Sequence, residues 1–217
     1  FGLFNFITYF SIQALVTTNR FDFMTSLDTI IPLVPNFIWV YHTLLPVVMI
    51  TMIALMKKRD VFFLAFFSFM LTSFILSIFY VLFPSFYPRG GIDVACASTW
   101  LMELTRGIDS AHNTFPSGHV AFSWLLVLAV SNATYIQQRT WLKISYVIWA
   151  LLISISTLVL KQHYIVDVAS GIVLACLCYF FSKKIMHYVL KAPNERLEIL
   201  PSNTVAADMH INKNTFV

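Results

Sequence analysis

Six long runs of apolar residues make up most of this chain, and they restrict its fold more than any other feature. A helix needs about 20 consecutive apolar residues to cross a bilayer. The runs are continuous rather than alternating, which favours helices over the strands of a membrane barrel. They cover Phe1–Val16, Phe37–Met56, Val61–Phe83, Val120–Ile136, Ile144–Leu160 and Tyr164–Phe181.

The composition agrees with a membrane protein. Hydrophobic residues are 59% of the chain and charged residues 11%, and the mean hydropathy is +0.77. A soluble domain carries about 25% charged residues. We therefore predict an all-α polytopic membrane protein, a bundle of six transmembrane helices. The chain begins at Phe1 without a Met, so we expect the first helix to be truncated.

The basic residues predict the orientation of the bundle. Ten of the 14 Lys and Arg residues lie between the second and third runs, between the fourth and fifth, or after the sixth. By the positive-inside rule, these segments are cytoplasmic. The net charge of +4 therefore reports topology, and without a soluble basic domain no nucleic-acid partner is expected. The protein is expected in a membrane, with its lipid bilayer as the surrounding partner.

Two parts of different composition follow one another along the chain. Residues 1–186 hold the apolar runs and form the predicted membrane domain. Residues 187–217 are polar and broken by Pro193 and Pro201, so we expect a disordered cytoplasmic tail. The three cysteines form no obvious disulfide pair, and no Cys/His spacing indicates zinc. We therefore predict no metal and no cofactor, and the sequence leaves the oligomeric state open.

Three loops are predicted to meet on the opposite, extracytoplasmic face. Residues 17–36 join the first two runs, residues 84–119 join the third and fourth, and residues 161–163 join the last two. The polar residues that could carry chemistry all lie in or beside these loops. The predicted active site therefore faces the periplasm, an organelle lumen or the cell exterior.

The string Pro116-Ser117-Gly118-His119 precedes the fourth apolar run. Proline in a first turn indicates a helix start, and Asn113 or Thr114 could cap it. A helix N-terminus binds anions, phosphate in particular. Ser117 adds a hydroxyl, Gly118 lets a ligand approach the backbone, and His119 lies beside any bound anion. The alternative is a plain helix cap with an interfacial histidine.

The string His163-Tyr164-Ile165-Val166-Asp167 opens the sixth run. The four-residue spacing places His163 and Asp167 on one helix face. A carboxylate in a membrane helix is costly, and such residues are usually functional. Asp167 could fix the His163 tautomer, leaving the other ring nitrogen as a nucleophile or base. The alternative is a structural pair that ties this helix to a neighbour.

Further basic residues surround the two strings. Lys161 could supply positive charge beside His163, or simply extend to the membrane interface. Arg89 could make a bidentate contact with a phosphate, or bind a lipid headgroup or a loop carbonyl. Arg106 and Asp109 could pair with each other.

With these motifs the chain resembles the type 2 phosphatidic acid phosphatase superfamily of membrane lipid phosphatases and phosphotransferases, over about residues 37–184. The second block of that family, Pro-Ser-Gly-His, is intact. The third block is matched at Ser156, His163 and Asp167, with Thr157 at its arginine position. The first block retains only Arg89, with Leu82 at its lysine position. This pattern is closest to the inositol-phosphorylceramide-synthase-like branch.

The resemblance implies a mechanism without a metal. His163 would attack phosphorus to form a phosphohistidine, oriented by Asp167. His119 would protonate the leaving oxygen and then activate water or an acceptor alcohol. Phosphate oxygens would be held by Arg89, Lys161, and the Ser117 and Gly118 amides.

Three functions stay open from the sequence. The first is hydrolysis of a phosphomonoester or pyrophosphate on a membrane lipid, phosphatidic acid-like or polyprenyl. The second is lipid phosphotransfer, like that of inositol-phosphorylceramide or sphingomyelin synthases. The third is a non-catalytic transporter or subunit, in which the His163–Asp167 pair is structural or relays protons.

Overall fold

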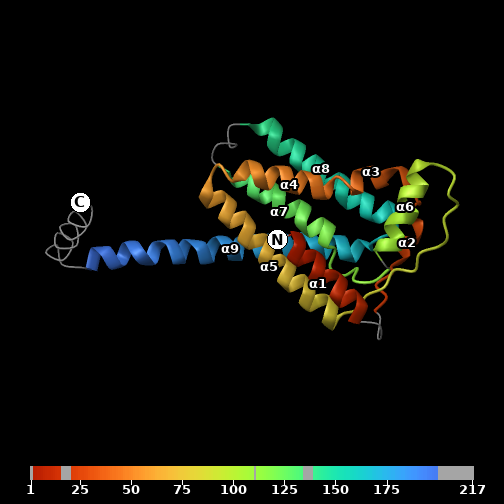
Figure 1. Cartoon of the computed structure of the whole chain (residues 1–217), viewed down its shortest axis with the longest axis horizontal. Coiled ribbons are helices and arrows are strands. Elements are labelled where there is room, and N and C mark those ends of the chain that lie inside the picture. The colour runs from red at the N-terminus through yellow and green to blue at the C-terminus, as the bar shows by residue number, and fades with distance from the viewer. Residues whose placement is uncertain (1, 16–20, 110, 134–138, 200–217) are drawn as a thin grey trace, which may run out of the picture.

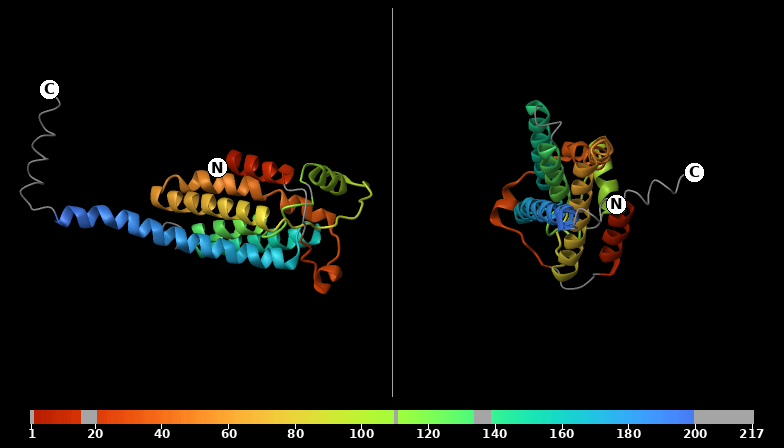
Figure 2. Two further views of the ribbon diagram at one scale, coloured as in Figure 1. Left: turned by 90° about the horizontal axis from the view of Figure 1, so that it is seen from below. Right: turned by 90° about the vertical axis from the view of Figure 1, so that its left-hand side faces the viewer.

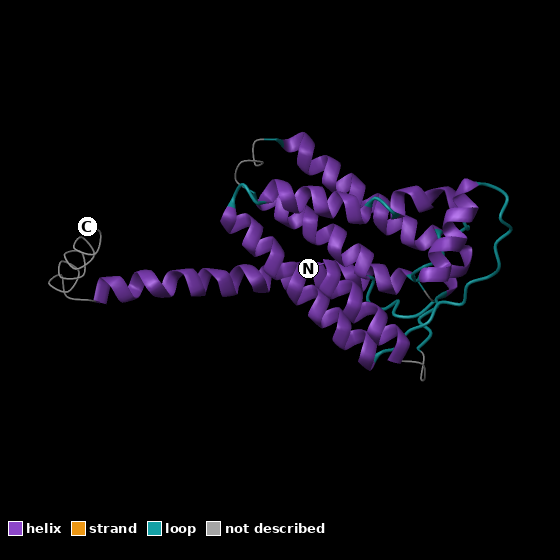
Figure 3. Cartoon of the chain, viewed as in Figure 1, coloured by secondary structure: helices purple, strands orange, loops and turns teal. Residues whose placement is uncertain are grey.

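The computed structural model describes residues 2–15, 21–109, 111–133 and 139–199. These residues form helices and loops, with isolated bridges Phe21–Ser85 and Phe86–His112 in place of strands (Figure 3). The predicted all-α class is therefore confirmed for this part of the chain. The elements are α1 (Gly2–Leu15), α2 (Ser26–Ile30), η1 (Pro35–Phe37), α3 (Ile38–Tyr41), α4 (Leu44–Leu55), α5 (Arg59–Leu82), α6 (Ala97–Ile108), α7 (Gly118–Asn132), α8 (Thr140–Val159) and α9 (Ile165–Ile199).

Four of the predicted spans are helices long and apolar enough to cross a membrane. They run over Pro35–Leu55, Arg59–Leu82, Thr140–Val159 and Ile165–Tyr188. The first of these joins η1, α3 and α4 end to end. The other two predicted spans correspond to shorter helices, α7 with 15 residues and α1 with 14. The chain is thus an apolar, helical membrane protein. That all six helices cross the membrane stays a prediction.

Helix α7 lies in the middle of the bundle, against α5, α8 and α9 (Figure 1). Its apolar residues point in every direction, which suits a helix enclosed by others. Leu125, Leu126 and Val130 are fully buried and pack with Phe69 of α5 and Tyr179 of α9. The central position matters because α7 carries the Pro-Ser-Gly-His string at its start.

The long loops and the short helices α2 and α6 gather at one end of the bundle, called here the loop end (Figure 3). Backbone hydrogen bonds join loops that are far apart in sequence. The Val34 amide donates to the Val159 carbonyl at 2.9 Å, and the Phe21 amide to the Pro84 carbonyl at 2.7 Å. The three loops predicted to meet on one face therefore do meet at one end of the molecule.

Helix α6 lies within the segment predicted to be a long loop, residues 84–119. It lies across the loop end of the bundle (Figure 1). Met102 and Thr105 are buried beneath it, whereas Trp100, Leu104 and Ile108 form an exposed apolar stripe at a spacing of four residues. It is an amphipathic helix, too short and too polar for a span prediction.

Helix α9 extends well beyond the rest of the bundle (Figure 2). Its 35 residues correspond to about 50 Å at ~1.5 Å per residue. The helix continues past residue 186, where the sequence analysis places the start of a disordered tail. Residues 200–217 of that predicted tail lie outside the described part of the chain.

Candidate active site

His163 lies in the turn before α9 and is 8% exposed. Its Nδ1 atom is 2.8 Å from the Thr114 carbonyl oxygen and 3.5 Å from Asp167 Oδ2. Both neighbours are acceptors, so they favour a proton on Nδ1. The hydrogen bonds of the described residues therefore occupy Nδ1, and Nε2 is the nitrogen left for a substrate.

Asp167 is fully buried in the first turn of α9. Its Oδ2 accepts from the Tyr164 amide at 2.8 Å, in addition to facing His163. The carboxylate thus caps its own helix, where the dipole favours negative charge. The start of the helix stabilises the buried carboxylate, and the carboxylate in turn orients the His163 ring through Nδ1.

The Thr114 carbonyl is a second partner for His163, which the sequence analysis did not identify. A single hydroxyl holds this part of the chain: Ser85 Oγ accepts from the Thr114 amide at 3.0 Å and the Phe115 amide at 2.7 Å. It also contacts Thr114 Oγ1 at 2.8 Å. Ser85 is 1% exposed and belongs to the loop after α5. No sequence signal marks it, because the contact depends on the tertiary fold.

His119, in the first turn of α7, faces the same space as His163. The two ring centroids are 6.2 Å apart. Tyr41 of α3 stacks on the His119 ring at 4.1 Å, and its hydroxyl is 3.4 Å from His119 Nδ1. Tyr41 is 4% exposed and was also not identified from the sequence. Its stacking fixes the plane of the His119 ring.

The starts of α7 and α9 are joined directly. The Ser117 amide donates to the Asp167 carbonyl oxygen at 3.0 Å. Ser117 is also the N-cap of α7, since its Oγ accepts from the Val120 amide at 3.4 Å. The helix begins at Gly118, so the expectation that Pro116 occupies the first turn, capped by Asn113 or Thr114, was wrong. The cap lies one residue after the proline.

The predicted phosphate ligands Ser117 and Gly118 are both engaged within the protein. The Ser117 amide is committed to Asp167, which removes it as a donor to an anion. A Cβ placed on Gly118 would lie 3.2 Å from the Tyr80 hydroxyl, so this glycine permits close packing of α7 on α5. An anion at this helix start would use amides of the first turn beyond Ser117.

Arg89, in the loop after α5, is half-buried and donates from Nη1 to the Asp109 carbonyl. This matches the loop-carbonyl reading of Arg89. The Asp109 carboxylate accepts from the Tyr9 hydroxyl at 2.6 Å, so Asp109 joins α1 to the loop end. Burial raises the pKa of the Asp109 carboxyl, while the Tyr9 hydrogen bond and the charges of Arg89 and His163 oppose that rise. Asp109 is thus a half-buried acid beside the histidine pair.

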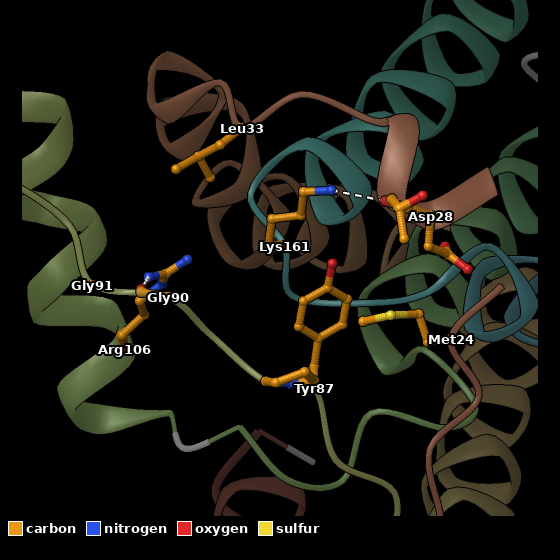
Figure 4. A pocket seen from close by; sticks show the side chains of 10 residues that line it. Met24, Asp28, Leu33, Tyr87, Gly90, Gly91, Arg106 and Lys161 are labelled. Carbon is orange, nitrogen blue, oxygen red and sulfur yellow. Dashed lines mark hydrogen bonds between the residues drawn. The ribbon is translucent and has the colours of Figure 1, made fainter. Parts of the chain in front are cut away.

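Lys161 and Arg106 line a cavity of about 250 Å³ at the loop end (Figure 4). The Lys161 amine donates to the Asp28 carbonyl oxygen at 2.9 Å. Arg106 Nη1 donates to the Gly90 carbonyl at 2.8 Å, so Arg106 is directed away from the predicted Asp109 pairing. Neither His119 nor His163 lines this cavity. Lys161 therefore shares a cavity with Arg106, and this cavity is separate from His119 and His163.

Within the described residues, no three His, Cys, Asp or Glu side chains are placed to hold a metal ion. The chemistry that this arrangement offers comes instead from paired imidazoles. One ring is fixed through Nδ1 and has a free nitrogen, and a second ring stands 6.2 Å away. Nucleophilic attack by one ring and proton transfer by the other is a standard use of two such groups.

An all-helical bundle of membrane-spanning length, with two histidines and a carboxylate at the starts of adjacent helices, defines an integral membrane protein with a buried polar site. The chain belongs to the PAP2 superfamily, whose family model matches residues 57–191. That range is more than half of the chain. It contains all the site residues predicted from the sequence, from Arg89 to Asp167.

Two individual proteins are also similar. Uncharacterized protein MJ0662 of Methanocaldococcus jannaschii is 38% identical over 77 residues, which are 36% of this chain and 30% of that protein. The matched part of the chain thus spans about a third of this curated relative. The crystal structure of Aquifex aeolicus LpxE superposes with a TM-score of 0.51 and 17% identity, over 74% of this chain and 87% of that one. At this identity, the similarity shows a shared fold.

Proposed function

We propose that the chain is a membrane lipid phosphatase that hydrolyses a phosphomonoester or pyrophosphate of a lipid through a phosphohistidine on His163. One observation carries the proposal: His163 is tied through Nδ1 to Thr114 and Asp167, with the His119 ring 6.2 Å away. Membership of the PAP2 superfamily supports the reaction class.

The spacing of the two rings suits one phosphoryl group held between them. Attack requires His163 Nε2 at about 3–3.5 Å from phosphorus, and proton transfer requires His119 at about 2.6–3.2 Å from the leaving oxygen. The ring centroids, 6.2 Å apart, place both imidazoles beside one such group. A second imidazole in direct contact with the first would leave no room for a substrate.

The first step forms a bond from His163 Nε2 to phosphorus and breaks the bond from phosphorus to the lipid oxygen. Protonated His119 gives its proton to that oxygen, so the lipid leaves as a neutral alcohol or, from a pyrophosphate, as the shorter phosphate. In the second step, water attacks phosphorus and gives a proton to His119. The bond to His163 breaks and inorganic phosphate leaves. Asp167 offsets the positive charge on the His163 ring throughout.

The site is proposed to face the extracytoplasmic side. The histidines lie at the starts of α7 and α9, whereas Lys57 and Lys58 precede α5 and Arg139 precedes α8, at the opposite end. The positive-inside rule places that basic end in the cytoplasm.

The central test is phosphate release by the purified chain from a panel of lipid phosphates, with His163→Ala. The variant should lose turnover while remaining folded and monodisperse. His187→Ala is the matched control, because His187 is exposed near the far end of the bundle on the same helix. Turnover by His163→Ala close to the wild-type rate would refute the nucleophile.

The role of His119 has its own test. In single-turnover measurements of the first step, His119→Ala should slow cleavage of an alkyl phosphate far more than cleavage of an aryl phosphate whose leaving group needs no protonation, because only the former depends on a general acid. Equal losses on both substrates would contradict that role.

Measuring phosphate release with and without an acceptor lipid separates the alternatives. Release of inorganic phosphate without an acceptor supports the phosphatase, whereas formation of a phosphorylated acceptor lipid without release of inorganic phosphate supports the phosphotransferase. No turnover under either condition would favour a non-catalytic membrane protein.

A further inference from the structure

The Arg106–Lys161 cavity is the strongest unexplained feature of the loop end. It is lined by side chains from four separate parts of the chain: the α2 segment, the loop after α5, α6, and the turn between α8 and α9. At roughly 30 Å³ per water, about 250 Å³ holds about eight waters, which exceeds the needs of one tetrahedral anion. Figure 4 shows Arg106 on one side of the cavity, with Lys161 and the Tyr87 ring on the other.

Neither cation forms an ion pair with an acid of the described residues. Among the described residues, the single ion pair within 4.0 Å joins His163 to Asp167. Arg106 and Lys161 instead donate to main-chain carbonyls, those of Gly90, Leu160 and Asp28. Carbonyls anchor these side chains without neutralising them. Burial lowers the pKa of the Arg106 guanidinium and the nearby charge of Arg89 lowers it further, while the charge of Glu103 on the same helix opposes that fall.

The carboxylate of Asp28 does not fill that role, although Asp28 lines the cavity. It is 3% exposed. Its Oδ2 accepts from both the amide and the hydroxyl of Thr25, at 2.8 and 2.6 Å. Its Oδ1 accepts from the Ile165 amide at 2.8 Å, at the start of α9. The acid is therefore used to cap α2 and α9.

The two cations have N–H groups that make no hydrogen bond among the described residues. The Nε of Arg106 is buried and finds no hydrogen-bond partner among the described residues. Lysine has three donors, of which Lys161 uses one on Asp28. The cavity thus offers two cations against one hydrogen-bonded carboxylate, with unused donors on Lys161, a combination that suits a phosphate or carboxylate.

The cavity adjoins the histidine pair. Tyr87, in its wall, stacks on Tyr164 with ring centroids 4.4 Å apart, and Tyr164 follows His163 directly. Arg106 also contacts the Leu160 carbonyl, in the turn that leads to His163. The tyrosine pair and the turn at Leu160 therefore connect the cavity wall to the segment that carries His163.

We propose that the Arg106–Lys161 cavity binds a second anionic group on the substrate headgroup, beyond the phosphate that is cleaved. The inference rests on the proposed phosphatase function and narrows its substrate class to lipids that carry two anionic groups. Arg106 is then a specificity residue, and Lys161 binds the second anion instead of the reacting one.

The experiment compares three lipids in detergent micelles with the full chain. Phosphatidic acid has one phosphate; diacylglycerol pyrophosphate has a second phosphate next to the first; phosphatidylinositol 4-phosphate has a phosphodiester across a ring from its phosphomonoester. Arg106→Gln should raise KM for at least one of the two-anion lipids about tenfold relative to KM for phosphatidic acid, with kcat retained, because one charge-assisted contact is lost. The lipid that responds shows how far apart the two anions lie.

Arg139→Gln is the matched control, since it removes the same charge at an exposed position before α8. It should leave the KM ratios unchanged. If Arg106→Gln is not monodisperse, Tyr87→Phe takes its place, because it keeps the ring stacked on Tyr164 and removes only the hydroxyl in the cavity. The expected change in the KM ratio is then about threefold.

Unchanged KM ratios in these variants, while the wild type turns over and His163→Ala does not, would overturn this inference and leave the phosphatase proposal standing. Full turnover by His163→Ala would instead refute His163 as the nucleophile in the proposed phosphatase mechanism. A wild type that hydrolyses none of the lipids would overturn both.

Discussion

Ser85 shows how one hydroxyl can position a reactive side chain that it does not touch. Ser85 Oγ accepts hydrogen bonds from the Thr114 and Phe115 amides. The Thr114 carbonyl oxygen in turn accepts a hydrogen bond from His163 Nδ1. Because Ser85 is buried, no water replaces its oxygen if the side chain is truncated. The orientation of His163 therefore depends on a residue in a different loop.

We expect Ser85→Ala to lower kcat at least tenfold and to destabilise the protein by about 1–3 kcal/mol, since buried donors lose their acceptor. Ser145→Ala, which removes an exposed hydroxyl from α8, is the control and should behave as the wild type. Activity and melting temperature are measured in the same detergent. A normal kcat in Ser85→Ala would show that the Thr114 carbonyl does not determine the orientation of the His163 ring.

Asp109 predicts a dependence of stability on pH. Burial raises the pKa of its carboxyl in the folded protein above the ordinary value of 3.8. Its contribution to stability is therefore fully present below that ordinary value and is lost as the pH rises through the folded pKa. Asp109→Asn removes this titration and keeps an oxygen for the Tyr9 hydroxyl.

The melting temperature of Asp109→Asn should equal that of the wild type near pH 3.5 and exceed it increasingly toward pH 8. Scanning fluorimetry across that range makes the comparison. A gap that is constant with pH, or that reverses sign, would contradict a raised Asp109 pKa.

The contact between α7 and α9 depends on one glycine. A Cβ on Gly171 would lie 2.7 Å from the Ser117 carbonyl oxygen and 3.2 Å from Val120 Cβ. Both neighbours belong to the first turn of α7, where neither can move without shifting the helix. Gly171 therefore sets the distance between the two helices that carry the histidines.

Gly171→Ala should separate α7 from α9, cost about 1–3 kcal/mol of stability and reduce kcat/KM, because overpacking displaces the helix starts. Gly107→Ala is the matched control, since a Cβ there meets nothing within 4 Å. Melting temperature and kcat/KM are compared for the two variants. If Gly171→Ala retains both, the helix contact is not what holds the histidines in place.

Local sequence patterns predicted the helices well, but they did not predict the long-range contacts. The apolar runs predicted α5 and α8 to within a few residues, because length and composition are local properties. The i, i+4 spacing likewise placed Asp167 beneath His163. Nothing in the sequence joins Asp28 to the Ile165 amide, 137 residues away, because this contact exists only once the loops have packed.

At the scale of the whole molecule, Cys96 provides a test of orientation. It is exposed at the loop end, whereas Cys178 is buried in α9. Hydrogen bonds from the Thr99 amide and hydroxyl lower the pKa of the Cys96 thiol, which increases its reactivity. A membrane-impermeant maleimide therefore reports which side of the membrane the loop end faces.

We expect Cys96 to react in intact cells or sealed right-side-out vesicles, and Cys96→Ser to abolish that labelling. In the Cys96→Ser background, Arg139→Cys at the other end should react only after permeabilisation. The reverse pattern would place the histidines on the cytoplasmic side.

Arg89, Arg106 and Lys161 at the loop end have one property in common: each donates hydrogen bonds to main-chain carbonyls. Every residue type carries a carbonyl, so the receiving positions are free to drift during evolution while the cations are not. Gly90, which receives Arg106, illustrates this, since a side chain there would meet nothing within 4 Å. In a saturation library, tolerance at Gly90 should therefore be broad and tolerance at Arg106 narrow, so that the scaffold can diverge around a fixed set of charges.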